Sequence, residues 1–438
     1  MARHGIGSGR RIRTSGAALL AVLLAAATLS ACGGSGDSGG AVTLTFWTHT
    51  HPPMIKLNRT LIAEYQRQHP NVRIEYQQIP NDEFDTKMLT AMSNGTGPDV
   101  LNLDDTTLRG EYLPKRLLAP IDYGALGAGS EEALKNRYLP RTLDGASADG
   151  QLYGLPSEFN ATAFAVNTRH FADAGLDPNT PPKTWQDVAT EAKKLAAAGH
   201  QQAFSFLYLH SGWYTQQLQT LLNQTGGTIT DPGHQKATVT SPRAQAAVSL
   251  WTGLAASGTE RTADPNKTSR EATAPFNDLA TGRQSMAMVY PWAMEQIRES
   301  NPDTFARLKL VPLPQLNPAA PVNRWYGYYW GVSRASEHQQ QAWQFISYLA
   351  NQSQRWLSDV KFIQPVKGWD TSPAGKGVPG LDVWSTAYRQ GKFDEVAPHF
   401  AEIKDAVMTM INDTVFDRVA IPDAANKAAG TINRSLGN

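Results

Sequence analysis

The chain has 438 residues with 40 basic and 39 acidic side chains, and its formal net charge is +1 at pH 7. Nucleic-acid binding requires clustered lysine and arginine, so this near-neutral composition argues against nucleic acid as a partner. The length allows two or three domains with substantial cores, and the single cysteine, Cys32, excludes an internal disulfide.

The first 31 residues are typical of a bacterial export signal. Several arginines precede a short apolar run, Ala17–Leu29, which is too brief to cross a bilayer. The run ends in LSAC, which resembles the lipobox of bacterial lipoproteins, whose cysteine receives a lipid and becomes the mature N-terminus. Residues 1–31 are therefore expected to be removed, Cys32 to be lipidated, and the Gly/Ser-rich residues 32–40 to form a flexible tether. An uncleaved anchor and an ordinary signal with an unrelated cysteine are the alternatives.

From Val42 onward, the pattern alternates between strands and helices. Strands are predicted at VTLTFW, VRIEYQQI and DVLNL, with helices between them over residues 55–69 and from Asn81 to the Asn94-Gly95 pair. This β-α-β-α-β order predicts a parallel sheet covered by helices. No later apolar run approaches the roughly 20 residues of a membrane-spanning helix.

A second series of strands is predicted at TAFAVN, FSFLY, SMAMVY and YYWGV. Thr184 and Asp187 have the spacing of a capping box for one intervening helix, and Pro242 opens another that runs to Ala256. These elements indicate a second α/β lobe.

The segment between the two series, Tyr153–Asn167, is predicted to be extended, because Pro156 disfavours helix before it and the following residues are strand-like. We expect it to pass between the lobes as a hinge.

Seven stretches, in their order and spacing, resemble family 1 extracellular solute-binding proteins. These are the receptors of ABC importers, many of them for sugars, and include the maltose-binding type. The resemblance extends from about Ala41 to about Leu436. It is carried by LTFWTHT, IAEYQRQHPNVRIEY, LTAMSNGTGPDVLNLDD, LYGLPSEFNATAFAVNT, KTWQDVATEAKKLA, TGRQSMAMVYPW and YYWGVSRASEHQQQAWQFISYL.

The resemblance implies an α/β architecture, the two-lobed periplasmic-binding-protein type II fold, in which each lobe is a mostly parallel sheet flanked by helices and the ligand lies between the lobes. It implies a first lobe of residues 41–157 and 330–367, and a second lobe of residues 158–329 and 368–438. We also expect a monomer with no enzyme activity, cofactor or metal. Its partners would be a small solute and the ABC permease subunits, at the outer face of the bacterial cytoplasmic membrane.

Two predicted loops of the first lobe follow strand ends, where ligands of open α/β sheets lie. One follows the first strand and the other follows the third. The expected ligand residues from these loops are Trp47, His49, His51, Asp104 and Asp105, with His49 and Asp105 ranked first.

Aromatic side chains are the second group of candidates, because sugars stack their C–H faces on aromatic rings while polar groups bind the hydroxyls. Trp292 in YPW matches a stacking position of sugar-binding members, and WYGYYW contributes Tyr326 and Tyr328. Trp213 and Phe400 lie in segments where some members place cleft aromatics. Half of WYGYYW is nevertheless expected in the core, and Trp213 alternatively begins an amphipathic helix.

Glu158 and Asn160 lie in the predicted hinge segment and are expected to face the cleft. A carboxylate there can accept two sugar hydroxyls. The alternative is a structural pair between Glu158 and a nearby arginine. By contrast, Trp185, Trp251, Trp343 and Trp356 lie on helical stripes and are expected to be packing residues.

Three other chemistries remain open from the sequence. Asp104, Asp105 and Glu158 contain the two carboxylates of a glycosidase, although no Walker or H-E-x-x-H motif accompanies them. His49 and His51 alternate as metal ligands can, but no H-x₃-H supports them. A polyamine or organic cation would also suit aromatic side chains. A sugar is favoured, because aromatic residues and carboxylates occur together without an arginine cluster for a strong anion.

Overall fold

The computed structural model describes residues 40–200, 202–206, 211–256 and 275–437. The expected leader, Cys32 and the tether up to residue 39 lie outside these ranges. Residues 1–40 and 41–438 are separate units, and all elements below belong to the second. None of the helices in the described ranges is long and apolar enough to span a bilayer.

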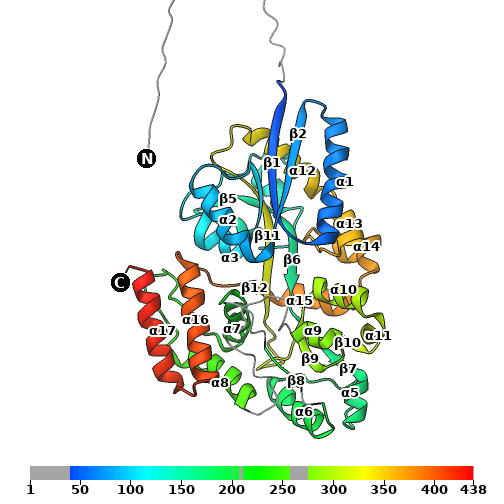
Figure 1. Cartoon of the computed structure of the whole chain (residues 1–438), viewed down its shortest axis with the longest axis vertical. Helices are drawn as coiled ribbons and strands as arrows, with labels where there is room; N and C mark the ends of the chain where they lie inside the picture. The colour runs from blue at the N-terminus through cyan, green and yellow to red at the C-terminus, as the bar shows by residue number, and fades with distance from the viewer. Residues whose placement is uncertain (1–39, 201, 207–210, 257–274, 438) are drawn as a thin grey trace, which may run out of the picture. The chain divides into compact units, whose positions relative to one another are not determined.

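Six strands form the first sheet, in the order β12-β11-β3-β1-β2 with β6 paired to β11 outside this path (Figure 1). β1 is parallel to β2 and β3, as the sequence predicts, whereas β11 is antiparallel to β3 and β6. The strands are β1 Val42–His49, β2 Val72–Ile79, β3 Val100–Asp104, β6 Gly154–Ala161, β11 Asn323–Val332 and β12 Gly391–Phe393.

The two faces of this sheet are covered by different helices. Phe46 of β1 is buried on the face covered by α1 (Pro52–Gln68) and α12 (Gln339–Ala350). Trp47 packs on the opposite face, beside the core that α2 (Asn81–Ser93) completes. Successive strand residues point to opposite faces, so this alternation gives the first lobe two cores. Smaller elements of this part are α3 Asp105–Thr107, α4 Glu131–Lys135, β4 Ser147–Ala148, β5 Gln151–Leu152, α13 Ser353–Arg355 and α14 Pro373–Lys376.

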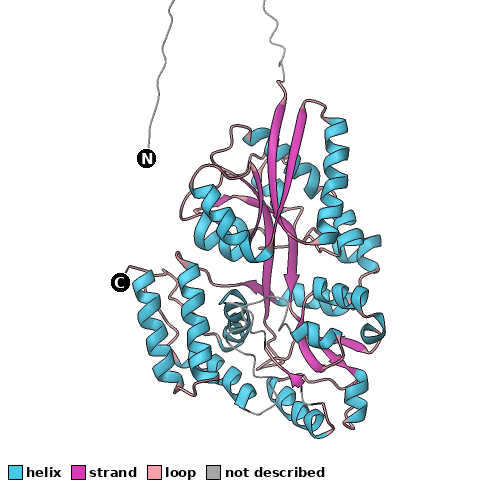
Figure 2. Cartoon of the chain, viewed as in Figure 1, coloured by secondary structure: helices cyan, strands magenta, loops and turns pink. Residues whose placement is uncertain are grey.

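A second sheet has the order β10-β7-β9-β8 and is surrounded by helices (Figure 2). Its strands are β7 Ala163–Asn167, β8 Gln202–Phe204, β9 Gln284–Val289 and β10 Leu308–Val311. The prediction of a mostly parallel sheet is wrong here, because only β8 and β9 pair in parallel, and β7 is antiparallel to both β9 and β10. β8 ends at Phe204, the first residue of the predicted strand FSFLY, and Leu207 and Tyr208 of that stretch are outside the described ranges.

Ten helices of the described ranges lie in the part of the chain that forms the second lobe. Their bounds are α5 Thr168–Asp173, α6 Trp185–Ala197, α7 Ser211–Thr225, α8 Pro242–Ala256, α9 Pro275–Ala280, α10 Pro291–Ser300, α11 Pro302–Phe305, α15 Leu381–Gln390, α16 Phe400–Val415 and α17 Ile421–Ser435. The predicted capping box of α6 is confirmed: Thr184 Oγ1 accepts a hydrogen bond from Asp187 N at 3.0 Å, and Asp187 Oδ2 accepts one from Thr184 N at 2.9 Å.

The chain passes from the first sheet to the second at Thr162, between β6 and β7, and returns between β10 and β11. Asn323 bonds the two passages together: its Nδ2 donates to Thr162 O at 2.7 Å, and its Oδ1 accepts from Thr162 N at 3.1 Å. The outgoing and returning strands are neighbours in each sheet and run in opposite directions, which explains the antiparallel pairs β6–β11 and β7–β10. β11 begins at Asn323, so the lobe boundary predicted at residue 330 falls within one continuous strand.

Gly391 begins β12 and lies against the ring of Trp325, where a Cβ atom would come within 1.9 Å of Trp325 Nε1. Trp325 is buried and donates that Nε1 to Tyr388 O, so it cannot move freely. We expect Gly391→Ala to lower the free energy of unfolding by about 1–3 kcal/mol through overpacking. Gly253→Ala is the matched control: its Cβ would meet nothing within 4 Å, and a helical alanine should stabilise α8 by about 0.5–1 kcal/mol. Urea unfolding curves with equal midpoints would contradict this expectation.

Candidate functional site

A cavity of about 290 Å³ lies beyond the carboxyl ends of β1 and β3 and extends to residues of α7 and α10. It brings together eight of the residues expected from the sequence: His49, His51, Asp104, Glu158, Trp213, Trp292, Tyr326 and Tyr328. These side chains come from six separate segments of the chain. The cavity is therefore the candidate solute site, and contact of each residue with a solute stays a prediction.

Two histidines form part of the first-lobe wall. The ring of His49 lies 4.6 Å from that of Tyr328 and 5.8 Å from that of Phe84. His51 precedes α1, where its Nδ1 accepts a 3.5 Å hydrogen bond from the Met54 amide, and its ring lies 4.8 Å from that of Phe362. Burial lowers the pKa of His51 to about 4, so this imidazole is neutral at pH 7.

Asp104 presents an ionised carboxylate to the cavity. It ends β3 and caps the short helix α3, and its Oδ1 accepts hydrogen bonds from the Thr106 and Thr107 amides, each at 3.0 Å. Burial acts to raise its pKa, but the nearby charge of Lys404 and the threonine hydrogen bonds act in the opposite direction. The result is a pKa below the ordinary value, because these groups favour the charged form.

Glu158 lies on β6 directly opposite Tyr328 of β11 and is 4% exposed. Its Oε1 accepts a 2.7 Å hydrogen bond from Asn160 Nδ2, and no partner for Oε2 is found among the described residues. Burial raises the pKa of Glu158 to about 7, against the opposing effect of the Asn160 hydrogen bond. Among the described residues Glu158 forms no ion pair with an arginine, so the alternative of a structural pair is not supported.

Aromatic rings of the second lobe form the facing wall. Trp292 Nε1 donates to Tyr326 Oη at 2.5 Å. The Trp292 ring is stacked on that of Tyr290, with centroids 5.8 Å apart, and lies 6.5 Å from that of Trp213. This packing fixes the orientation of the rings, which is what stacking on a sugar face requires. Trp213 thus both begins α7, as the alternative interpretation predicted, and lines the cavity.

Four expected residues do not line this cavity: Trp47, Asp105, Asn160 and Phe400. Asp105 had been ranked first but is fully buried, and its two oxygens accept from Arg109 Nη2 at 2.6 Å and from Gly327 N at 2.9 Å. It fastens the loop after β3 to β11, so Asp104 rather than Asp105 reaches the cavity.

The other three lie beside or beneath the site. Asn160 is buried and orients Glu158. Phe400 is 3% exposed in the second-lobe core, and its ring centroid lies 5.9 Å from Lys404 Nζ. Trp47 lines a separate surface hollow over α2. The four expected packing tryptophans, Trp185, Trp251, Trp343 and Trp356, are confirmed as buried.

Several lining residues were not expected from the sequence. They are Thr50, Asn81, Phe84, Asp85, Thr106, Thr107, Gly212, Gln216, Asn277, Gln296, Phe362 and Lys404. Gln216 had a usable pattern, because it lies one helical turn after Trp213 and therefore shares its face of α7. Lys404 had a similar pattern, because it lies one helical turn after the candidate Phe400 on α16. Phe362 had none, since it approaches through tertiary folding from a segment far from the other candidates.

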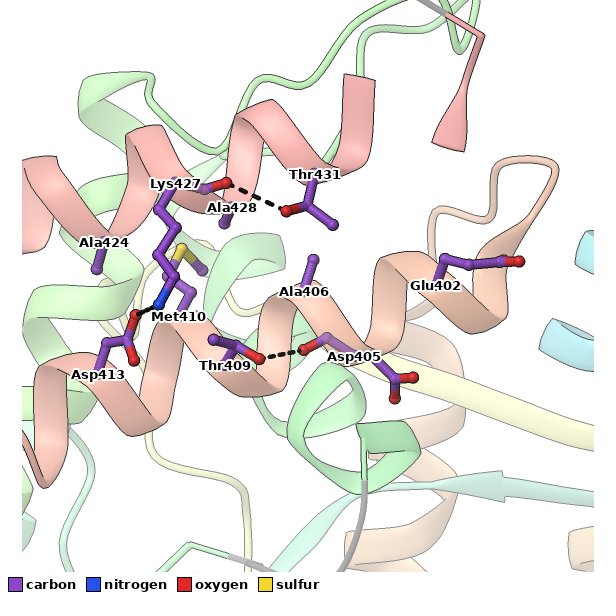
Figure 3. A pocket seen from close by; sticks show the side chains of 10 residues that line it. All are labelled: Glu402, Asp405, Ala406, Thr409, Met410, Asp413, Ala424, Lys427, Ala428 and Thr431. Carbon is purple, nitrogen blue, oxygen red and sulfur yellow. Dashed lines mark hydrogen bonds and ion pairs between the residues drawn. The ribbon is translucent and has the colours of Figure 1, made fainter. Parts of the chain in front are cut away.

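A second hollow lies between α16 and α17 (Figure 3). Lys427 Nζ of α17 lies 2.8 Å from Asp413 Oδ2 of α16, so these two charges pair across the hollow, and Thr409 Oγ1 donates to the Asp405 backbone carbonyl at 2.9 Å (Figure 3). None of the described residues that line it is aromatic. It lacks the stacking surfaces of the first cavity and is not the candidate site. As for metals, the residues with described positions contain no group of three or more His, Cys, Asp or Glu side chains arranged to hold an ion.

Comparison with known proteins gives consistent matches. A family model described as bacterial extracellular solute-binding protein matches residues 57–356. A Brucella abortus (strain 2308) protein named in general terms as a binding protein is 23% identical, over 94% of this chain and 98% of its own. The sn-glycerol-3-phosphate-binding periplasmic protein UgpB of Escherichia coli (strain K12) is 25% identical over a shorter region, 41% of this chain and 40% of its own.

Solved structures match over most of the chain. The GacH receptor of Streptomyces glaucescens GLA.O, whose structures include a complex with acarbose, superposes with a TM-score of 0.77. The identity is 17%, and the match covers 91% of this chain and 99% of the receptor. At 17% identity the similarity shows a shared fold and nothing more specific.

Proposed function

Since the chain belongs to the bacterial extracellular solute-binding proteins, we propose that it captures a sugar in the cavity between its lobes and delivers it to an ABC permease. The predicted family and two-lobed fold are confirmed, and the family consists of transport binding proteins rather than enzymes. An oligosaccharide is the form of sugar that we propose.

The observation that carries this proposal is the pairing of aromatic rings with carboxylates across one cavity. Trp213 and Trp292 offer ring faces for the apolar side of a pyranose, and Asp104 and Glu158 offer hydroxyl acceptors. Gln216 adds a buried amide oxygen, Oε1, with no hydrogen-bond partner among the described residues. A few convergent polar groups within an aromatic lining are typical of a site that orients a polyhydroxylated ligand.

A phosphate ester, such as the one in the name of UgpB, is a poorer fit to this cavity. Among the described residues that line the cavity, Lys404 is the only lysine or arginine, and its charge acts on Asp104. Asp104 and Glu158 line the same space, and carboxylates repel an anion. A polyamine, an organic cation or a metal ion stays the alternative solute.

The membrane part of the proposal rests on the sequence. We propose that Cys32 carries a lipid, that residues 32–40 are a tether, and that the monomeric protein works at the outer face of the cytoplasmic membrane. A tether of about eight Gly/Ser-rich residues has a root-mean-square span of roughly 15 Å, which keeps the protein beside its permease.

A thermal-shift screen tests the proposed solute class. Mono- and oligosaccharides are compared with sn-glycerol-3-phosphate, spermidine and zinc. We expect at least one saccharide to raise the melting temperature, because a ligand at 100 times its Kd adds about 2.7 kcal/mol to stability. A shift with the phosphate ester, the polyamine or the metal, and none with any saccharide, would overturn the sugar proposal while leaving the family unaffected.

A further inference from the structure

An apolar pocket, here called the α10–α15 pocket, is lined by residues of α10, β10 and α15 and by the segment after α13. Its volume is about 290 Å³, close to the lower limit of roughly 300 Å³ for small-molecule sites. Buried apolar side chains form its floor, and partly exposed ones lie at its rim. The floor contains Met294, Leu357, Ile363 and Trp384, and the rim contains Leu308 and Leu310. The pocket therefore suits the apolar part of a small ligand.

The α10–α15 pocket is separate from the candidate solute cavity, although the two have walls in common. Trp292 of α10 lines the candidate cavity, whereas Met294 of the same helix lines the pocket. After α13, Phe362 lines the candidate cavity, and its neighbours Lys361 and Ile363 line the pocket. The two spaces share no lining residue in the described part of the chain. A ligand in the pocket therefore does not have to displace the solute.

Two lysines that line the α10–α15 pocket have neutral hydrogen-bond partners. Lys309 Nζ donates to the side-chain oxygen of Asn179, Oδ1, at 2.7 Å, and Lys361 Nζ donates to the Ser358 carbonyl at 2.5 Å. Both lysines are partly buried, and neither forms an ion pair with a residue that the structure describes. An ammonium group has three donors, so each lysine has donors left for a ligand.

A carboxylate, Glu295, also lines the α10–α15 pocket, but a neighbour on the same helix compensates it. Arg298 Nε and Nη2 donate to the two oxygens of Glu295 at 2.8 and 2.5 Å. Both oxygens of this carboxylate therefore have a cationic partner already. Glu295 does not pair with Lys309 or Lys361, which stay available to an anion.

We propose that the α10–α15 pocket is a second ligand site, which binds a small molecule with an apolar body and one anionic group, such as an alkyl carboxylate. The alkyl chain would lie against Leu357, Ile363 and Trp384, and the carboxylate would pair with Lys309 and Lys361. Burial of the chain supplies affinity, and the two ammonium groups select the charge. The proposal does not depend on which solute occupies the candidate cavity.

The test is titration calorimetry with octanoate, octanol and octylamine, which share a chain and differ in charge, at pH 7 and an ionic strength of about 0.01 M. We expect one octanoate per chain, bound at least about fivefold more tightly than octanol or octylamine, because partly exposed charge pairs contribute modestly. Hexanoate should bind about tenfold more weakly than octanoate, since each buried methylene changes affinity about fourfold. Equal binding of octanol or octylamine would contradict the role of the lysines.

Variants separate the charge from the apolar pocket. Lys309→Gln/Lys361→Asn removes both ammonium groups and should abolish the preference for octanoate over octanol. Asparagine is chosen at position 361 because it tolerates the positive φ of 64° found there. Lys56→Gln/Lys193→Gln is the matched control: it removes two exposed lysines that do not line the pocket, and it should preserve the preference. Val378→Trp fills the rim of the pocket and should abolish octanoate binding.

The remaining outcomes distinguish this site from the proposed sugar site. Octanoate should still bind when the candidate cavity is saturated with the saccharide from the thermal-shift screen, and loss of binding would place octanoate in that cavity. Unchanged binding to Val378→Trp, or several octanoates per chain that no variant affects, would also overturn the inference. If octanoate does not bind the wild type, the second site fails and the sugar-binding function stands. If octanoate binds as predicted and no saccharide does, the reverse holds.

Discussion

Replacing Asp394 by alanine is expected to lower the free energy of unfolding by about 3–5 kcal/mol, the usual cost of breaking one side of a buried ion pair. Arg324 Nε and Nη2 donate to the two oxygens of Asp394 at 2.7 and 2.6 Å, and the side chains are 0% and 1% exposed. Arg324 lies on β11 and Asp394 follows β12, next to the passage of the chain between the two sheets. The variant would leave a guanidinium buried without its countercharge. Chemical unfolding monitored by tryptophan fluorescence measures the loss.

Two controls make this prediction specific. Glu75→Gln breaks the Arg73–Glu75 pair, whose side chains are 73% and 52% exposed, and should cost less than about 1 kcal/mol. The double variant Arg324→Met/Asp394→Leu removes both charges and should be more stable than Asp394→Ala alone. If Glu75→Gln and Asp394→Ala are equally destabilising, the buried pair does not have the role assigned to it.

Trp292→Ala is expected to weaken solute binding at least about tenfold, or 1.4 kcal/mol. The variant removes the ring that faces the cavity and also the Nε1 donor that holds the Tyr326 hydroxyl. Aromatic contacts contribute about 0.5–1.5 kcal/mol beyond their buried area, so the combined loss should exceed tenfold for a stacked sugar. Titration calorimetry with the saccharide that gives the largest thermal shift measures the effect.

Trp47→Ala is the matched control for Trp292→Ala. Trp47 is also a partly buried tryptophan, but it packs over α2 outside the candidate cavity. Its replacement should lower the melting temperature and leave the affinity within about twofold, since it removes packing and no predicted solute contact. Equal losses of affinity in the two variants would point to a general loss of structure and against a stacking role for Trp292.

Local patterns predicted the elements whose stabilising contacts lie close in sequence. The strand at Val42 and the capping box between Thr184 and Asp187 are examples, because alternation and a three-residue spacing specify them directly. The sequence also allows Asn81 to cap a helix, but Asn81 is the first residue of α2 and Pro80 occupies the cap position. The direction of the strands in the second sheet depends on how the chain passes between lobes, which no local pattern specifies.

The candidate site shows the same division. The predicted strand ends identified His49 and Asp104 as lining residues of the cavity. The predicted extended segment after Pro156 identified Glu158. The sequence alone could not show which of Asp104 and Asp105 lines the cavity. Asp105 is held away from the cavity by Arg109 and by the Gly327 amide of a distant strand. It also could not place Phe362, which lines the cavity from a segment far from the other candidates.

The most direct measurement is a crystal structure of the protein grown with the saccharide that stabilises it most. We predict an intact saccharide in the cavity, with a ring stacked on Trp292 and polar groups within hydrogen-bond distance of Asp104 and Glu158. A saccharide bound elsewhere, such as between α16 and α17, or one found cleaved in the cavity, would contradict the account.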